Sequence, residues 1–163
     1  LVYTQTSPDV PQLAKHISTI ELKTGNKPTV DVDATSGFQW PWAWYLREIA
    51  LAGYPQYGQH LPSSMMEQQV LIIHSQNKLA IQEPVKEKYG EGQRFRHRWW
   101  FPEHTYRDLS LKKILISIFD RSAWVRSMDY FLYRDLDHKL SSEDAYVYFD
   151  DFEMRKFSSL ELE

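Results

Sequence analysis

The sequence predicts one α/β domain with three layers: a mostly parallel central sheet with helices on both faces, Rossmann-like but without a dinucleotide site. Residues 1–34 read as a strand, a capped helix and a second strand, which is the pattern of a βαβ unit with parallel strands. Residues 70–74 add a continuous apolar strand, as is common for strands buried on both faces. Hydrophobic residues at 42% and charged residues at 25% are ordinary for a globular domain.

The first unit is the best defined. Residues 1–6 have β-propensity, and Ser7, Pro8 and Asp9 supply an N-cap, a proline for the first turn and an early acid. Apolar residues then recur at helical spacing to about residue 19, and residues 29–34 alternate Val with Asp. The turn between strand and helix contains no glycine, so a pyrophosphate cannot approach it closely.

The remaining elements follow from proline, glycine and periodicity. We expect, in order, a helix from Pro41 to residue 53, a long loop over 53–68, a strand over 70–74, a helix or turn over 77–89 interrupted by Pro84, a strand over 93–101, helices over 109–119 and 120–132, and a last strand over 145–149. Residues 1–152 are predicted to form the single domain, and residues 153–163 an acidic tail. The chain starts in strand-like sequence without an initiator Met, which favours a fragment of a longer protein.

Several functional classes are disfavoured. A net charge of −3 argues against a dedicated nucleic-acid binder, and the lack of cysteine excludes a disulfide framework. No apolar run reaches the roughly 20 residues of a membrane span. Gly-rich phosphate loops, nucleophile elbows and paired zinc-binding histidines are all missing. We therefore expect no catalytic residue, metal or cofactor in this chain; the spacing of His97, Glu103, His104 and Asp108 fits no familiar ligand motif.

Two acidic residues on the second strand have two interpretations. Asp31 and Asp33 lie two apart, so they share a face at the carboxyl end of a predicted parallel strand. That location suits a binding site. Capping of the next element by their side chains is the alternative, and it is the interpretation we favour.

The most unusual stretch is Trp40-Pro41-Trp42-Ala43-Trp44-Tyr45-Leu46-Arg47-Glu48. On a helix, Trp40 and Trp44 share one face while Trp42 and Tyr45 point elsewhere, so the rings cannot all be buried together. Trp44, Tyr45 and Arg47 are candidates for a recognition surface, with rings for a sugar or lipid and a guanidinium for a phosphate. The alternative is a core helix with a solvated end.

A second candidate surface lies on the strand predicted over 93–101. Arg94, Arg96 and Arg98 alternate there with Phe95, His97 and Trp99, which places the arginines on one face and the rings on the other. Such a face suits anionic headgroups or single-stranded nucleic acid. It also suits an edge strand whose charges prevent aggregation, and the acidic net charge favours this second interpretation.

Four stretches together resemble the C-terminal soluble part of a family of multi-spanning membrane glycosyltransferases of GT-C architecture. The family includes the dolichyl-phosphate-mannose–protein mannosyltransferases and the archaeal flippase-associated proteins of N-glycosylation. The stretches are residues 2–9, 40–47, 98–103, and 130–134 with 144–148.

The resemblance implies a parent protein that transfers a sugar from a polyprenyl-phosphate donor, with its catalytic acid on a loop of the membrane part. This chain would then be a non-catalytic accessory domain on the extracytoplasmic face of the membrane. Its partners would be the parent's own membrane domain and a lipid-linked sugar or glycan acceptor, with no role for nucleic acid. The first candidates for a functional surface are the residues that match the family motif, Trp44, Tyr45 and Arg47. The second candidates are Arg98, Trp99 and Trp100. A stand-alone carbohydrate- or protein-binding module is the alternative function.

Overall fold

The computed structural model describes residues 5–58, 60–100, 120, 121, 124, 125, 128, 141–151 and 154. The chain divides into two units, one of residues 5–98 and 142–163 and the other of residues 1–4 and 99–141. Nearly all described residues belong to the first unit, and the architecture below is that of this unit. The predicted helix over 109–119 and most of the one over 120–132 lie outside the described residues.

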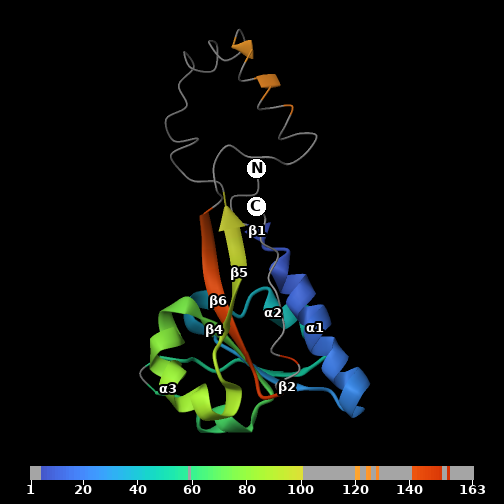
Figure 1. The fold of residues 1–163 in the computed structure, drawn as a ribbon, viewed down its shortest axis with the longest axis vertical. Coiled ribbons are helices and arrows are strands. Elements are labelled where there is room, and N and C mark those ends of the chain that lie inside the picture. The colour runs from blue at the N-terminus through green and yellow to red at the C-terminus, as the bar shows by residue number, and fades with distance from the viewer. Residues whose placement is uncertain are drawn as a thin grey trace. The chain divides into compact units, whose positions relative to one another are not determined.

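A single sheet organises the described part of the chain (Figure 1). Its six strands follow the order β1 (Gln5–Thr6), β5 (Gln93–Trp100), β6 (Ser141–Phe149), β4 (Val70–His74), β2 (Thr29–Val32) and β3 (Leu51–Gly53). β2 pairs in parallel with both β3 and β4, whereas β4 and β6 are antiparallel. β5 and β6 also run in opposite directions (Figure 1).

This topology shows that the predicted fold class is wrong. The sheet is mixed, mostly antiparallel and strongly curled, with few helices, and it is not the central sheet of a three-layer Rossmann-like fold. The predicted parallel pairing of residues 29–34 with 70–74 does occur, between β2 and β4. β1, however, lies at the far edge beside β5, and three strands separate it from β2. The first strand, helix and second strand are therefore not a βαβ unit of neighbouring strands.

Helix α1 (Asp9–Thr24) begins where the sequence predicts and ends later. The Ser7 hydroxyl accepts a hydrogen bond from the backbone N–H of Asp9 at 3.2 Å, which satisfies one of the free donors at the helix start. Ile20 continues the buried stripe beyond residue 19. The helix stops at Gly25, whose φ of 75° gives the left-handed conformation typical of a C-terminal glycine.

Apolar side chains cover both faces of β4, so that this strand is buried along its whole length. Val70 and Ile72 face one cluster, to which α1 contributes, and Leu71 and Ile73 face the other. Helix α3 (Lys78–Tyr89) packs on the second cluster, and Figure 1 shows α1 and α3 on opposite sides of the strands.

Helix α3 runs through Pro84, where the sequence predicts an interruption. Proline removes one backbone hydrogen bond from a helix interior, at a cost of about 3 kcal/mol. Ile81, Val85 and Tyr89, spaced four residues apart, are fully buried and hold the helix against the sheet. The Tyr89 hydroxyl also lies 2.8 Å from the carbonyl of Met65 and 2.7 Å from that of Gln68.

The start of the predicted tail contacts α1. Met154, at the start of the predicted tail, is buried, and His16 Nε2 on α1 lies 2.9 Å from its carbonyl oxygen. Most of the tail lies outside the described residues.

Within the part that the structure describes, no helix is long and apolar enough to cross a bilayer.

Candidate functional site

The segment with three tryptophans, residues 37–47, is called the aromatic segment below. Its only helix is α2 (Trp42–Tyr45), so the helix predicted to run from Pro41 to residue 53 is much shorter than expected. The chain turns at Leu46, whose carbonyl accepts from the N–H groups of Ile49 and Ala50. It then enters β3, where Leu51 pairs with Thr29. The last part of the predicted helix is therefore a turn followed by an edge strand.

Each interpretation of the aromatic segment holds for part of it. Trp42 and Leu46 are fully buried and belong to the core, and Tyr45 is half-buried against it. Trp40 and Trp44, in contrast, are 60% and 64% exposed. Trp42 is therefore buried while the other two tryptophans are exposed, and Trp40 and Trp44 together with Arg47 are called the aromatic surface below.

Arg47 is part of the same exposed surface. Its guanidinium carbon lies 3.7 Å from the centre of a Trp44 ring, a cation–π contact, and its Nη1 donates to the Trp44 carbonyl at 3.0 Å. Its Nε lies 3.4 Å from the Glu48 carboxylate, which is itself exposed. The guanidinium is thus held against one face of Trp44, with water access on its other side.

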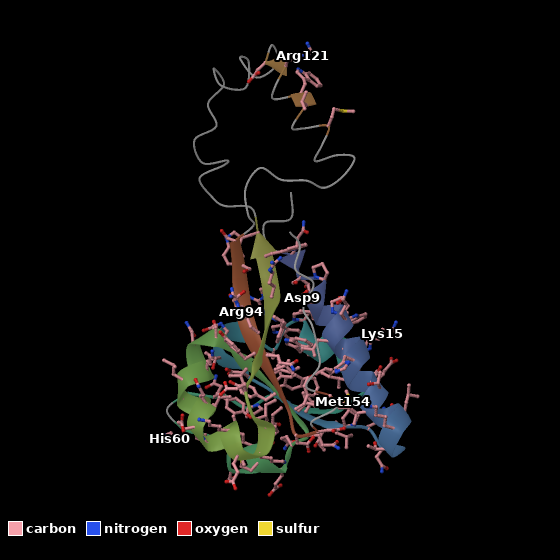
Figure 2. All side chains as sticks on the ribbon, viewed as in Figure 1. Asp9, Lys15, His60, Arg94, Arg121 and Met154 are labelled. Atoms are coloured by element: carbon pink, nitrogen blue, oxygen red, sulfur yellow. The ribbon has the colours of Figure 1, made fainter. Side chains whose placement is uncertain are left out.

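The three arginines of β5 do not form one free cationic face. Arg94 donates to the Asp144 carboxylate on β6, with Nε at 2.9 Å. Arg98 donates from Nη2 to the carbonyls of Gly37 and Trp40, both at 3.0 Å. The backbone N–H of Arg96 donates to the carboxylate of Asp9 on α1 at 2.9 Å, which anchors that helix to β5. Figure 2 labels Asp9 at the start of α1. The alternation of the strand is nevertheless as predicted for Phe95 and His97, which are both buried.

A group of polar residues contacts the aromatic segment through Arg98 and His97. It is called the polar cluster and comprises His74, His97, Arg98 and Glu143. Glu143 Oε1 accepts from His74 Nε2 at 2.8 Å and lies 4.0 Å from His97 Nδ1. Glu143 Oε2 lies 3.8 Å from Arg98 Nη1. β4, β5 and β6 each supply part of this cluster, so its members come together only when the three strands pair.

The hydrogen bonds of His74 fix its tautomer. Its Nδ1 accepts from the backbone N–H of Gln76 at 3.0 Å, so the ring proton resides on Nε2 and is donated to Glu143. A metal ligand needs a free lone pair on the nitrogen that faces the ion, and Nε2 has none in this arrangement. The described residues also contain no group of three or more histidines and carboxylates able to hold a metal. Glu103, His104 and Asp108 lie outside the described residues.

His97 is the most deeply buried member of the polar cluster. Its ring is fully buried and stacks on Trp42 with 6.2 Å between ring centres, and Phe38 lies 4.1 Å away on the same measure. Burial lowers the pKa of His97 to about 3, and the charge of Arg98 acts in the same direction, whereas the backbone of Trp40 opposes it weakly. Glu143 lies near enough to form an ion pair with a charged His97, but the cost of desolvation is larger, so His97 is neutral.

Asp31 and Asp33 have different surroundings. Asp33 is fully buried, and its carboxylate accepts from the backbone N–H groups of Thr35, Tyr57 and His74 and from the Asn77 amide. This is the capping role that the sequence favours. Asp31 is bonded through Oδ2 to the Tyr57 hydroxyl at 3.3 Å, and burial raises its pKa.

The structure thus joins two predicted stretches that are far apart in sequence. Residues 40–47 and 98 meet through the hydrogen bonds of Arg98 and the ring contacts of His97. Trp99 and Trp100, the last residues of β5, are half-buried and belong to the other unit. His74 and Glu143 were not predicted as members of a site. Glu143 could have been found, because the buried residues Ala145, Val147 and Phe149 place it on the same face of the strand.

Comparisons with protein families, with characterised proteins and with solved structures found no match.

Proposed function

We propose that this chain is the extracytoplasmic accessory domain of a multi-spanning membrane glycosyltransferase that uses a polyprenyl-phosphate-linked sugar. The chain carries no catalytic residue in this proposal. Its aromatic surface, made of Trp40, Trp44 and Arg47, contacts the parent's membrane domain beside the transfer site. The enzyme class is proposed from the stretches that resemble the family. The contact with the membrane domain is proposed from the exposure of the aromatic surface.

The observation that carries the proposal is the exposure of two tryptophans next to an arginine. Large exposed aromatic residues together with arginine are enriched in the centres of protein interfaces. Trp40 and Trp44 are 60% and 64% exposed, although Trp42 between them is fully buried. Because Arg47 covers one face of Trp44, that face is closed to stacking on a sugar ring. The arrangement therefore favours a protein contact over a stand-alone sugar platform.

The test is Arg47→Ala in the full-length parent. We expect sugar transfer to fall about tenfold or more, equivalent to about 1.4 kcal/mol of transition-state stabilisation. Arg47→Lys should restore only part of the activity, because an ammonium group lacks the planar fork of a guanidinium. In the 163-residue chain, Arg47→Ala should leave the melting temperature within a few degrees, since Arg47 and Glu48 form an exposed pair.

Arg94→Ala is the matched control, because Arg94 is also exposed and also paired with a carboxylate. It should leave transfer unchanged. Full activity in Arg47→Ala would contradict the proposal, and so would a protein whose gene encodes no apolar spans around this chain. Binding of free glycans by the chain alone, lost in Trp40→Ala, would instead support the carbohydrate-binding module.

A further inference from the structure

Arg98 connects the sheet to the aromatic segment. Its Nη2 donates to the carbonyls of Gly37 and Trp40, both at 3.0 Å. The first of these carbonyls follows two residues in the left-handed region, Ser36 at φ 54° and Gly37 at φ 75°. Such a conformation is costly for a residue with a side chain, so the surrounding contacts must maintain it.

Glu143 holds Arg98 from the other side. One oxygen lies 3.8 Å from Arg98 Nη1, and the other accepts from His74 Nε2 at 2.8 Å. His74 is itself fixed by the N–H of Gln76. A continuous series of polar contacts therefore leads from β4 through β6 and β5 to the carbonyl of Trp40.

This pair of charges is shielded, in contrast to many surface pairs. The side chains of Arg98 and Glu143 are 28% and 24% exposed, whereas that of Arg94 is 67% exposed. Attraction between opposite charges becomes stronger as water is excluded from them, and the bonds from Arg98 to the two carbonyls, which carry a charged donor, are strengthened in the same way. Phe38 adds an apolar contact at the same place, since its ring lies 5.3 Å from that of His74 and 4.1 Å from that of His97.

We infer that Arg98 and Glu143 are positioning residues for the aromatic surface: they fix the backbone from which Trp40, Trp44 and Arg47 project. That the aromatic surface contacts a membrane domain rests on the proposed function, but the role of Arg98 and Glu143 in positioning this surface does not. Arg98 thereby has an inward role, through the carbonyls of the aromatic segment, in place of the headgroup or nucleic-acid contact that its strand pattern suggested.

Hydrogen exchange of the 163-residue chain tests the inference without any sugar-transfer assay. The amides to follow are those of Trp40, Ala43 and Leu46, each of which donates a backbone hydrogen bond. Arg98→Gln should accelerate their exchange about tenfold, the size expected when one or two hydrogen bonds to a charged group are lost. Glu143→Gln should accelerate it in the same direction but less, because its contact with Arg98 is an ion pair at 3.8 Å. The amides of Val70–His74 in β4 should change much less, because a positioning role is local.

Arg94→Gln and Asp144→Asn are the matched controls, since they break a pair between the same two strands that does not touch the aromatic segment. They should leave the amides of Trp40, Ala43 and Leu46 unchanged. If Arg98→Gln fails to fold, the comparison is made with Arg98→Lys, which keeps the charge but not the planar fork. Unchanged exchange in the aromatic segment, or equal acceleration there and in β4, overturns the inference.

A second readout separates this inference from the proposed function. In the full-length parent, Arg98→Gln should reduce sugar transfer and Arg94→Gln should not. If Arg47→Ala has no effect on transfer while the exchange result holds, the proposed function fails and the positioning role stands. If Arg47→Ala reduces transfer and exchange is unchanged, the positioning role fails alone.

Discussion

Asp33→Ala should lower the free energy of unfolding by about 3 to 5 kcal/mol, because a buried carboxylate with several donors would be lost. The Asp33 side chain is fully buried and accepts from four donors. Those donors come from the turn after β2, the loop at Tyr57, the end of β4 and Asn77. Removal of the carboxylate leaves them buried without a partner, and each such donor costs about 1 to 3 kcal/mol, though the costs are not additive.

Asp31→Asn is the control for Asp33, two residues away, because Asp31 lies on β2 and Asp33 directly follows that strand. Burial raises the pKa of Asp31, so its charged form is less favourable in the folded protein than in the unfolded chain. The folded state therefore gains stability as the pH falls and Asp31 takes up a proton, and Asp31→Asn should change stability at pH 7 by less than about 1 kcal/mol. Urea denaturation of both variants measures the difference. Equal losses in the two would show that Asp33 is not the residue that joins these segments.

Two elements that depend on local pattern were predicted well, although the helix from Pro41 to residue 53 and the interruption at Pro84 were wrong. The start of α1 follows from Ser7, and β4 from an apolar run that is buried on both faces. The fold class was wrong because it depends on pairing between distant segments. Ser7 donates its backbone N–H to the carbonyl of His97, 90 residues away, so that β1 joins β5 and not β2. Helical spacing and alternation describe each element but do not specify which strand lies beside it.

The site shows the same division. The alternation of β5 predicts that Phe95 and His97 face the core, and both are buried. The sequence alone did not bring Arg98 to the carbonyls of Gly37 and Trp40, because that contact joins residues about 60 positions apart. It also assigned no role to His74, whose contact with Glu143 requires β6 to lie beside β4. The residues of the polar cluster can be read from the sequence, but they come together only because β4, β5 and β6 lie side by side.

His97 should make the protein less stable in mild acid. Burial, assisted by the charge of Arg98, lowers its pKa in the folded state to about 3, whereas in the unfolded chain it is near the ordinary value of about 6.5. Neither ring nitrogen has a hydrogen bond of ordinary geometry among the described residues, and the weak contact with the backbone of Trp40 raises the pKa less than burial lowers it. Glu143, 4.0 Å away, is already bonded to His74. The folded protein thus offers little to stabilise a charged imidazole.

The sign of the effect follows from proton binding. As the pH falls below about 6.5, His97 takes up a proton in the unfolded chain but not in the folded protein, so unfolding becomes more favourable. The stability that a neutral His97 provides is complete above pH 6.5 and is lost as the pH falls toward about 3. Between pH 7.5 and pH 5 the loss from this residue should be about 2 kcal/mol.

Chemical denaturation of the wild type and of His97→Phe at pH 7.5 and pH 5 measures this contribution. Phenylalanine keeps a flat ring between Phe38 and Trp42 but cannot bind a proton, so the difference in stability between the two pH values should shrink by about 2 kcal/mol. His60→Asn is the control, because His60 is exposed and the variant should retain the pH dependence of the wild type. The same pH dependence in His97→Phe and in the wild type would mean that another group causes the loss of stability in acid.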